Sequence, residues 1–154
     1  MPVFDFSHRG KDGRSLLDSG PLIKVEVEVP EPLQADLERR GKRVPPKRVG
    51  WALIDTGASL SAVHEPVLKD LGISPFDCIK TWSPHGQGRS WVYPAKISFP
   101  ALGIRDLPMG RVVGSKIEWQ ASDGNSLIML LGRDILNGFL FVYNGKQSRI
   151  TLAY

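Results

Sequence analysis

Asp55 stands where a carboxylate could do acid–base chemistry. It follows the short apolar run 49–54 and is followed directly by Thr56 and Gly57. The run predicts a buried strand, and the triplet predicts a tight turn in which glycine permits close backbone approach. Two such carboxylates a few ångströms apart share one proton, so that one activates a water as base while the other acts as acid toward a carbonyl. That pair would hydrolyse an amide.

A second segment supports this interpretation, because the triplet alone also occurs in ordinary loop turns. The triplet is extended by Ala58-Ser59, and the run Leu-Leu-Gly-Arg-Asp-Ile-Leu follows downstream at 130–136. In order and approximate separation, the two segments resemble the signatures of the retroviral-type aspartic proteases, the retropepsins. The resemblance covers about residues 20–154 and suggests a cellular, bacterial-type member of that family.

The resemblance implies a role for each residue of the turn. Asp55 would be the catalytic carboxylate, Thr56 would lock the turns of two subunits together, and Gly57 would bind substrate backbone. Ala58 would complete the turn.

The downstream segment would support the turn from beneath. Gly132 and Arg133 match the glycine–arginine pair that packs there in the family. The family's arginine commonly meets an acidic residue two positions after the motif glycine. This chain has Ser59 at that place, so the sequence leaves the partner of Arg133 open.

A flexible glycine-bearing hairpin covers the active site in the family, and a segment between the two signatures matches its place. Glycines there are flanked by two indoles that could close over a peptide and exclude water. The alternative is a tryptophan-flanked surface hairpin without a role in binding. The residues concerned are Trp82, His85, Gly86, Gln87, Gly88 and Trp91.

The sequence holds one credible catalytic triplet, whereas the chemistry needs two. Asp18-Ser19-Gly20 is a permitted variant, but Pro21 follows it and no clear buried strand precedes it. A symmetric homodimer with the site on its axis is therefore expected to provide the second carboxylate. The expected partners are a second copy of the chain and a peptide or protein substrate. The alternative is a catalytically silent module of the same fold that binds peptides or only dimerises.

The sequence gives little support for a serine hydrolase, a dinucleotide-binding site or a metal site. Ser59, Ser61 and His64 lie close in sequence without a nucleophile elbow, and Gly86-Gln87-Gly88 lacks the third glycine of a dinucleotide site. Three scattered histidines and the lone Cys78 give no metal-ligand spacing, so neither a metal nor another cofactor is expected.

Composition is that of an ordinary globular domain. The chain has 154 residues, 42% of them hydrophobic and 23% charged, and no apolar run approaches the length of a membrane span. One cysteine and the lack of a signal-type N-terminus favour a cytoplasmic location. The net charge of +4 permits nucleic-acid binding, but the basic stretch 39–48 has no interleaved aromatic residue and is interpreted as a solvated loop.

The elements predict a mainly β domain, built as a closed or curved sheet with one or two short helices. Residues 1–20 form an irregular arm, and residues 21–154 form the protease-like domain with an insertion at about 33–48. Alternating apolar and charged residues make 22–29 the clearest strand. The other expected strands are 49–54, 78–82, 90–99, 107–113, 127–131, 139–143 and 149–154, the last two joined at Asn144-Gly145. The expected helices are 33–40, 66–71 and 132–137.

Overall fold

The structure is a computed structural model of all 154 residues, and it describes residues 1–7, 16–83, 86–120 and 124–154. Ten strands form in this part of the chain: β1 (Val3–Ser7), β2 (Leu22–Glu28), β3 (Arg48–Ile54), β4 (Ala62–His64), β5 (Asp77–Ser83), β6 (Gly86–Phe99), β7 (Ile104–Ser115), β8 (Leu127–Leu131), β9 (Leu140–Asn144) and β10 (Arg149–Ala153). Short helices join them: α1 (Leu16–Ser19), α2 (Glu31–Arg39), α3 (Glu65–Asp70), α4 (Arg133–Leu136) and the 3-10 turns η1 (Pro100–Leu102) and η2 (Gly145–Gln147). The prediction of a mainly β domain is confirmed.

The larger sheet closes on itself. Its strands run in the order β2-β3-β8-β4-β7-β6-β5, and β2 also pairs with β6, so that six of the strands form a barrel. The expected alternation appears along β2, where Val25 and Val27 are fully buried while Lys24 and Glu26 point outward. Apolar side chains from the strands fill the interior, as the complete burial of Val63, Ile97 and Met129 shows.

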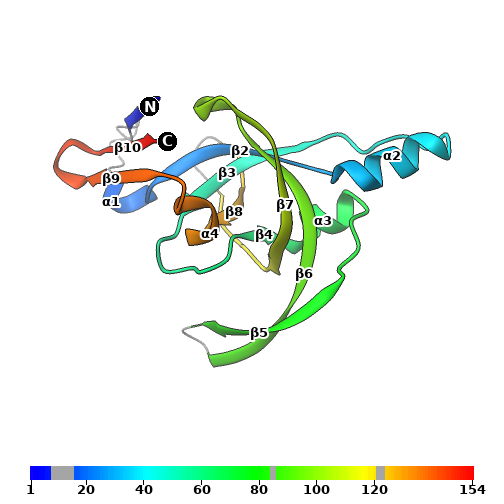
Figure 1. Ribbon diagram of the computed structural model, residues 1–154. Coiled ribbons are helices and arrows are strands. Elements are labelled where there is room, and N and C mark those ends of the chain that lie inside the picture. Colours follow the sequence, from blue (N-terminus) through cyan, green and yellow to red (C-terminus); the bar gives the residue numbers. More distant parts are fainter. Residues whose placement is uncertain (8–15, 84–85, 121–123) are drawn as a thin grey trace.

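Two parts stand out from the barrel. The 14-residue strand β6 pairs with β5 through its first half and with β2 and β7 through its second half. The β5–β6 hairpin therefore projects beyond the barrel, at the bottom of the view in Figure 1. Helix α2, which has no buried residue, projects on another side and overlaps the first part of residues 33–48.

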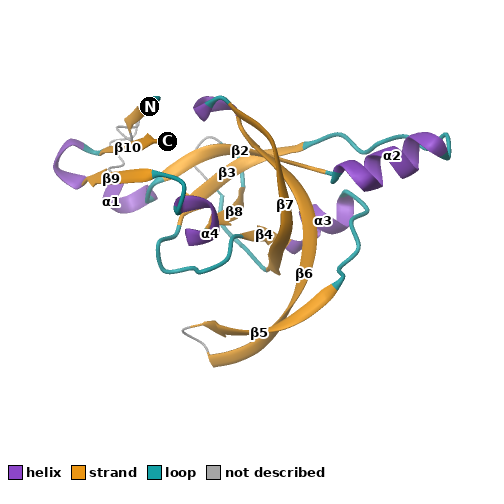
Figure 2. Ribbon diagram, in the orientation of Figure 1, coloured by secondary structure: helices purple, strands orange, loops and turns teal. Residues whose placement is uncertain are grey.

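A second, three-stranded sheet joins the two ends of the chain. Its order is β1-β10-β9, with both pairings antiparallel, so the termini lie close together (Figure 2). Tyr154 stacks on Phe4 with ring centroids 5.9 Å apart, and its hydroxyl donates to the carbonyl of Leu102 at 2.8 Å. These contacts attach the C-terminus to the barrel.

The prediction of an irregular lead-in over residues 1–20 is wrong where those residues are described. Val3 to Ser7 alternate at period two and form β1, which pairs with the chain's own β10. Leu16 in α1 is fully buried, so this segment packs without a partner. The glycines of residues 1–20 led to the prediction of an irregular segment despite the short strand pattern. Gly10 and Gly13 lie outside the described residues.

The turn after β9 also differs in detail from the expected one. Asn144 is the last residue of β9, and its side chain accepts a hydrogen bond from the amide of Gln147 at 3.1 Å. The left-handed backbone falls on Ser148, with φ of 48°, and not on Gly145. A four-residue connection over 145–148 therefore replaces a tight Asn-Gly turn.

Candidate active site

The turn after β3 orients the Asp55 carboxylate. Oδ1 of Asp55 accepts hydrogen bonds from the amides of Gly57 at 2.9 Å and Ala58 at 3.2 Å. The aspartate is half-buried, while Thr56 and Gly57 are exposed. Because the turn engages one carboxylate oxygen, the side chain is fixed while its other oxygen remains available for chemistry.

Parallel pairing explains why two distant segments meet here. Strands β3 and β8 run side by side with Ile54 opposite Leu131, so the residues that follow them emerge at the same edge. The amide of Asp55 donates to the carbonyl of Leu131 at 2.9 Å. The amide of Arg133 donates to the carbonyl of Ala58 at 2.9 Å. The downstream segment thus holds the turn at both ends.

Gly132 lies against the backbone of the loop that follows the turn. A Cβ atom at this position would meet the carbonyl carbon of Leu60 at 2.7 Å and the amide nitrogen of Ser61 at 2.9 Å. Real Cβ atoms essentially never show such distances, so the close approach requires glycine.

Arg133 finds its partner in the turn itself. Its Nη1 donates to the backbone carbonyls of Thr56 at 2.7 Å and Gly57 at 3.0 Å. This guanidinium therefore braces the turn through main-chain oxygens, which explains how a chain with Ser59 in place of an acidic residue still engages the arginine. Thr56 is exposed in the single chain.

Two further residues complete the support, and the sequence interpretation did not single them out for this role. The hydroxyl of Ser61, which is fully buried, donates to Oδ1 of Asp134 at 2.6 Å and accepts from the amide of Gly132 at 3.0 Å. Oδ2 of Asp134 accepts from the amide of Ser61 at 2.9 Å. An acid in the first turn of a helix is usually explained by the helix end alone, so its sequence position gave no distinct signal.

The β5–β6 hairpin places the predicted flap residues along its length. Trp82 faces Gln87 near the tip, and Thr81 faces Gly88. Gly86 has φ of 114°, which a tight reversal at the tip requires. His85 lies outside the described residues.

The two indoles occupy different parts of the hairpin. Trp82 is 78% exposed near the tip. Trp91 is opposite Cys78, nearer the barrel, and lines a cavity of about 320 Å³ together with Glu65 and Lys69 of α3. Trp91 therefore lies at the base of the hairpin, beside α3.

A buried tyrosine ties that base to α3. The Tyr93 hydroxyl donates to Oε1 of Glu65 at 2.7 Å, and Lys69 bonds the other carboxylate oxygen at 3.1 Å. The Tyr93 hydrogen bond holds the pKa of Glu65 below its ordinary value, with Lys69 contributing in the same direction against the effect of burial. Burial, followed by the bond to Glu65, raises the pKa of Tyr93.

Tyr93→Phe should lower the free energy of unfolding by about 1 to 2 kcal/mol at pH 7. The pKa of Glu65 is lowered on folding. Its contribution to the free energy of unfolding is therefore present above about pH 4.3 and is lost as pH falls through the lowered pKa. The raised pKa of Tyr93 makes its contribution present below about pH 10 and lost above it. Urea unfolding of the wild-type chain and of Tyr93→Phe at pH 7 and pH 3 would measure the difference in their free energies of unfolding, which should be smaller at pH 3. An equal difference at both pH values would contradict it.

Two other titratable candidates lie on other elements. Asp18 is the third residue of α1, whose turn is closed by the bond from the amide of Gly20 to the carbonyl of Leu16. Cys78 is a half-buried thiol on β5. Within the described residues, no three His, Cys, Asp or Glu side chains cluster as a metal site would need. No helix in that part of the chain is long and apolar enough to cross a membrane.

Comparison with solved structures finds a structural similarity. No family model matches the chain, and no curated protein matches it. Among solved structures, the chain is similar to the solution structure of Simian Foamy Virus (mac) protease, with 17% sequence identity and a TM-score of 0.45. The match covers 76% of this chain and 92% of that one.

Proposed function

We propose that this chain is an aspartic endopeptidase of the retropepsin type, which hydrolyses peptide bonds as a homodimer. The observation that carries the proposal is the Asp55 turn, where two amides fix one carboxylate oxygen and the segment 131–133 holds the backbone. A carboxylate held this rigidly at the end of a buried strand can be matched by a second one across a two-fold axis.

The two Asp55 side chains would share one proton, because like charges at close range cannot both ionise cheaply. The ionised carboxylate takes a proton from a water, whose oxygen attacks the peptide carbonyl carbon. The protonated carboxyl gives its proton to the carbonyl oxygen. As the carbon–nitrogen bond breaks, the nitrogen takes the proton that the first carboxylate had removed from the water. A hydroxyl of the tetrahedral intermediate gives its proton to the other carboxylate, so the pair again shares one proton.

The terminal sheet is the proposed dimer contact. It adjoins the candidate site, since α4 leads from the turn's support directly into β9 (Figure 1). Val3 on β1 and Leu140 and Val142 on β9 are exposed on its outer strands. Burial of these side chains against a second copy would bring the two Asp55 turns together.

The hairpin β5–β6 would close over the bound peptide. Trp82 near its tip would cover the substrate, and Gly86 and Gly88 would allow the tip to move. Trp91 at its base would set the hairpin against α3.

Incubating the purified chain with a peptide library across pH, followed by mass spectrometry, tests the activity. We expect internal cleavage that a statine-type peptide mimic inhibits, because the mimic's hydroxyl stands in for the attacking water between the carboxylates. Binding of the mimic without turnover would instead favour the silent peptide-binding module. The absence of both binding and turnover would refute the proposal.

A further inference from the structure

We infer that one face of the β5–β6 hairpin binds single-stranded nucleic acid, with phosphates held by Lys80 and Arg89 and bases stacked on the two indoles that flank them. The inference does not depend on the proposed peptidase activity. It starts from the register of the hairpin, which brings together basic and aromatic residues from two separate strands.

Lys80 and Arg89 stand directly opposite each other in β5 and β6, and both side chains are exposed. Directly opposite residues of an antiparallel pair share a face, with Cβ atoms about 4.5 to 5.5 Å apart. Two positive charges in this position repel each other and destabilise the pair. An anion bound between them would offset the repulsion.

The hairpin supplies no acid to do this. Asp77 is the one acidic residue of β5 and β6, and it bonds Arg111 at 3.3 Å. Because side chains alternate along a strand, Asp77 lies on the opposite face from Lys80. In the part of the chain that the structure describes, neither Lys80 nor Arg89 forms an ion pair. The two charges are therefore available to an anionic ligand.

Two indoles flank the cations on the same face. Trp82 follows Lys80 by two residues along β5, toward the tip of the hairpin. Trp91 follows Arg89 by two residues along β6, toward the barrel. Alternation therefore places both rings on the face of the cations. Trp82 is 78% exposed and Trp91 is 52% exposed, and rings this accessible can stack on bases of any sequence.

The cavity beside Trp91 gives room for a base against the indole. It has a volume of about 320 Å³, and Lys69, Ser74 and Pro75 are among the residues that line it. Glu65 is its one carboxylate, and both oxygens are engaged, by the Tyr93 hydroxyl and by Lys69. The negative charge in the wall is therefore already compensated.

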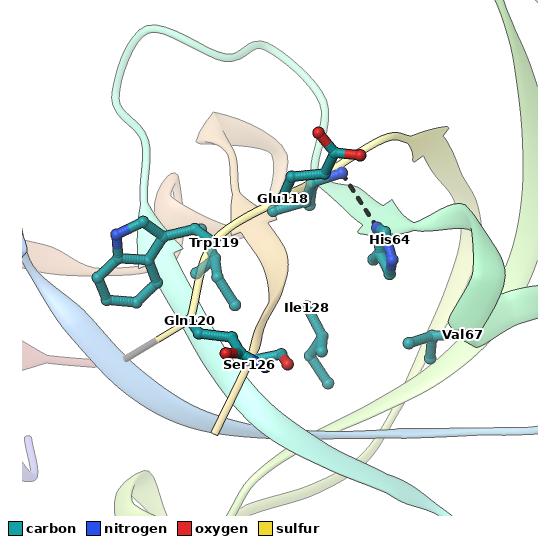
Figure 3. A pocket seen from close by; sticks show the side chains of 9 residues that line it. His64, Val67, Glu118, Trp119, Gln120, Ser126 and Ile128 are labelled. Carbon is teal, nitrogen blue, oxygen red and sulfur yellow. Dashed lines mark hydrogen bonds between the residues drawn. The ribbon is translucent and has the colours of Figure 1, made fainter. Parts of the chain in front are cut away.

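The larger cavity of the molecule does not suit an anion. It has a volume of about 470 Å³ and lies between β4, α3 and the start of β8 (Figure 3). Its described lining includes no lysine or arginine, and Glu118 adds a carboxylate. The charge of the hairpin face is thus a local feature.

The basic stretch 39–48 also lacks the combination found on the hairpin. No aromatic residue lies within it. Several of its cations are already paired with acids: Arg39 and Arg40 with Asp36, Lys47 with Glu26, and Arg48 with Asp70.

The indoles decide between two kinds of anionic partner. An acidic peptide would meet the two cations but has no need of exposed rings beside them. A single strand of nucleic acid carries phosphates and stacking bases together, so it matches both features of the face. Trp82 is also the residue proposed to cover a bound peptide, and a strand stacked on it would compete with that closure.

Fluorescence anisotropy of a labelled oligothymidylate of about ten nucleotides, titrated with the full chain, tests the inference. We expect the affinity to fall about sevenfold between about 50 and 200 mM salt, because two phosphate contacts release counterions. Lys80→Gln combined with Arg89→Gln should lower the affinity at least about tenfold at the lower salt concentration. Trp91→Leu should lower it at least about fivefold, because a stacked base is lost.

Lys42→Gln combined with Arg43→Gln is the matched control, since it removes the same charge from two exposed residues without aromatic neighbours in sequence. Its affinity should stay within about twofold of the wild-type value. The Lys80 and Arg89 double variant relieves a repulsion, so the hairpin should still form.

Equal losses in the two double variants would overturn the inference, because net charge alone would then explain the binding. Wild-type affinity in the Lys80 and Arg89 double variant or in Trp91→Leu would overturn it as well. Binding of a polyglutamate peptide without binding of the oligothymidylate would also contradict it, and would assign the face to an acidic protein partner.

Discussion

Asp55→Asn is expected to lower kcat/KM for peptide hydrolysis by at least about a thousandfold while leaving the free energy of unfolding nearly unchanged. The asparagine Oδ1 can still accept from the amides of Gly57 and Ala58, so the turn keeps its shape. The substitution removes the carboxylate that shares and transfers a proton. Peptide turnover and urea unfolding of the same preparations would measure both effects.

Asp18→Asn is the control for this substitution. Asp18 lies in α1, so the same chemical change there should leave turnover within about twofold of the wild-type value. Loss of turnover in Asp18→Asn with retention in Asp55→Asn would show that the site has been assigned to the wrong carboxylate.

Gly132→Ala is expected to lower the free energy of unfolding by about 2 to 3 kcal/mol and turnover by at least about tenfold. The added methyl group would press on the backbone of Leu60 and Ser61, which cannot move aside as a flexible side chain could. Displacement of this backbone would shift the loop that carries the catalytic turn. Thermal unfolding and peptide turnover would report the two effects.

Gly138→Ala is the matched control six residues along the chain. A Cβ there would meet its nearest atom, the carbonyl oxygen of Ile135, at an ordinary 3.6 Å. The substitution should therefore change stability by no more than about 0.5 kcal/mol. If both variants were equally destabilised, the close approach at Gly132 would not be the cause.

Local patterns predicted most elements of the fold. The apolar–charged alternation of 22–29 predicted β2, and the helix expected at 66–71 forms as α3. The three-residue strand β4 was missed, because its pairing with β7 and β8 depends on segments far along the chain. The N-terminal strand was missed for a related reason, since β1 is ordered by β10 from the other end.

In the candidate site, too, local sequence predicted some features, while others depend on pairing between distant segments. The motifs predicted Asp55 and the Gly132–Arg133 pair, because each is a fixed local sequence. They did not predict that Arg133 would bond main-chain oxygens of the turn, or that Ser61 and Asp134 would link the two segments. Those contacts arise from the parallel pairing of β3 with β8, which no short pattern contains.

Mixing wild-type chains with about a ninefold excess of Asp55→Asn, under conditions that allow subunit exchange, tests the shared site most directly. If each site needs an Asp55 from each of two chains, about one wild-type chain in ten meets another at random. Activity per wild-type chain should then fall about tenfold, because mixed dimers carry one functional carboxylate. Activity per wild-type chain that stays constant across the mixing series, with exchange confirmed, would contradict the two-chain site and require a second acid within one chain.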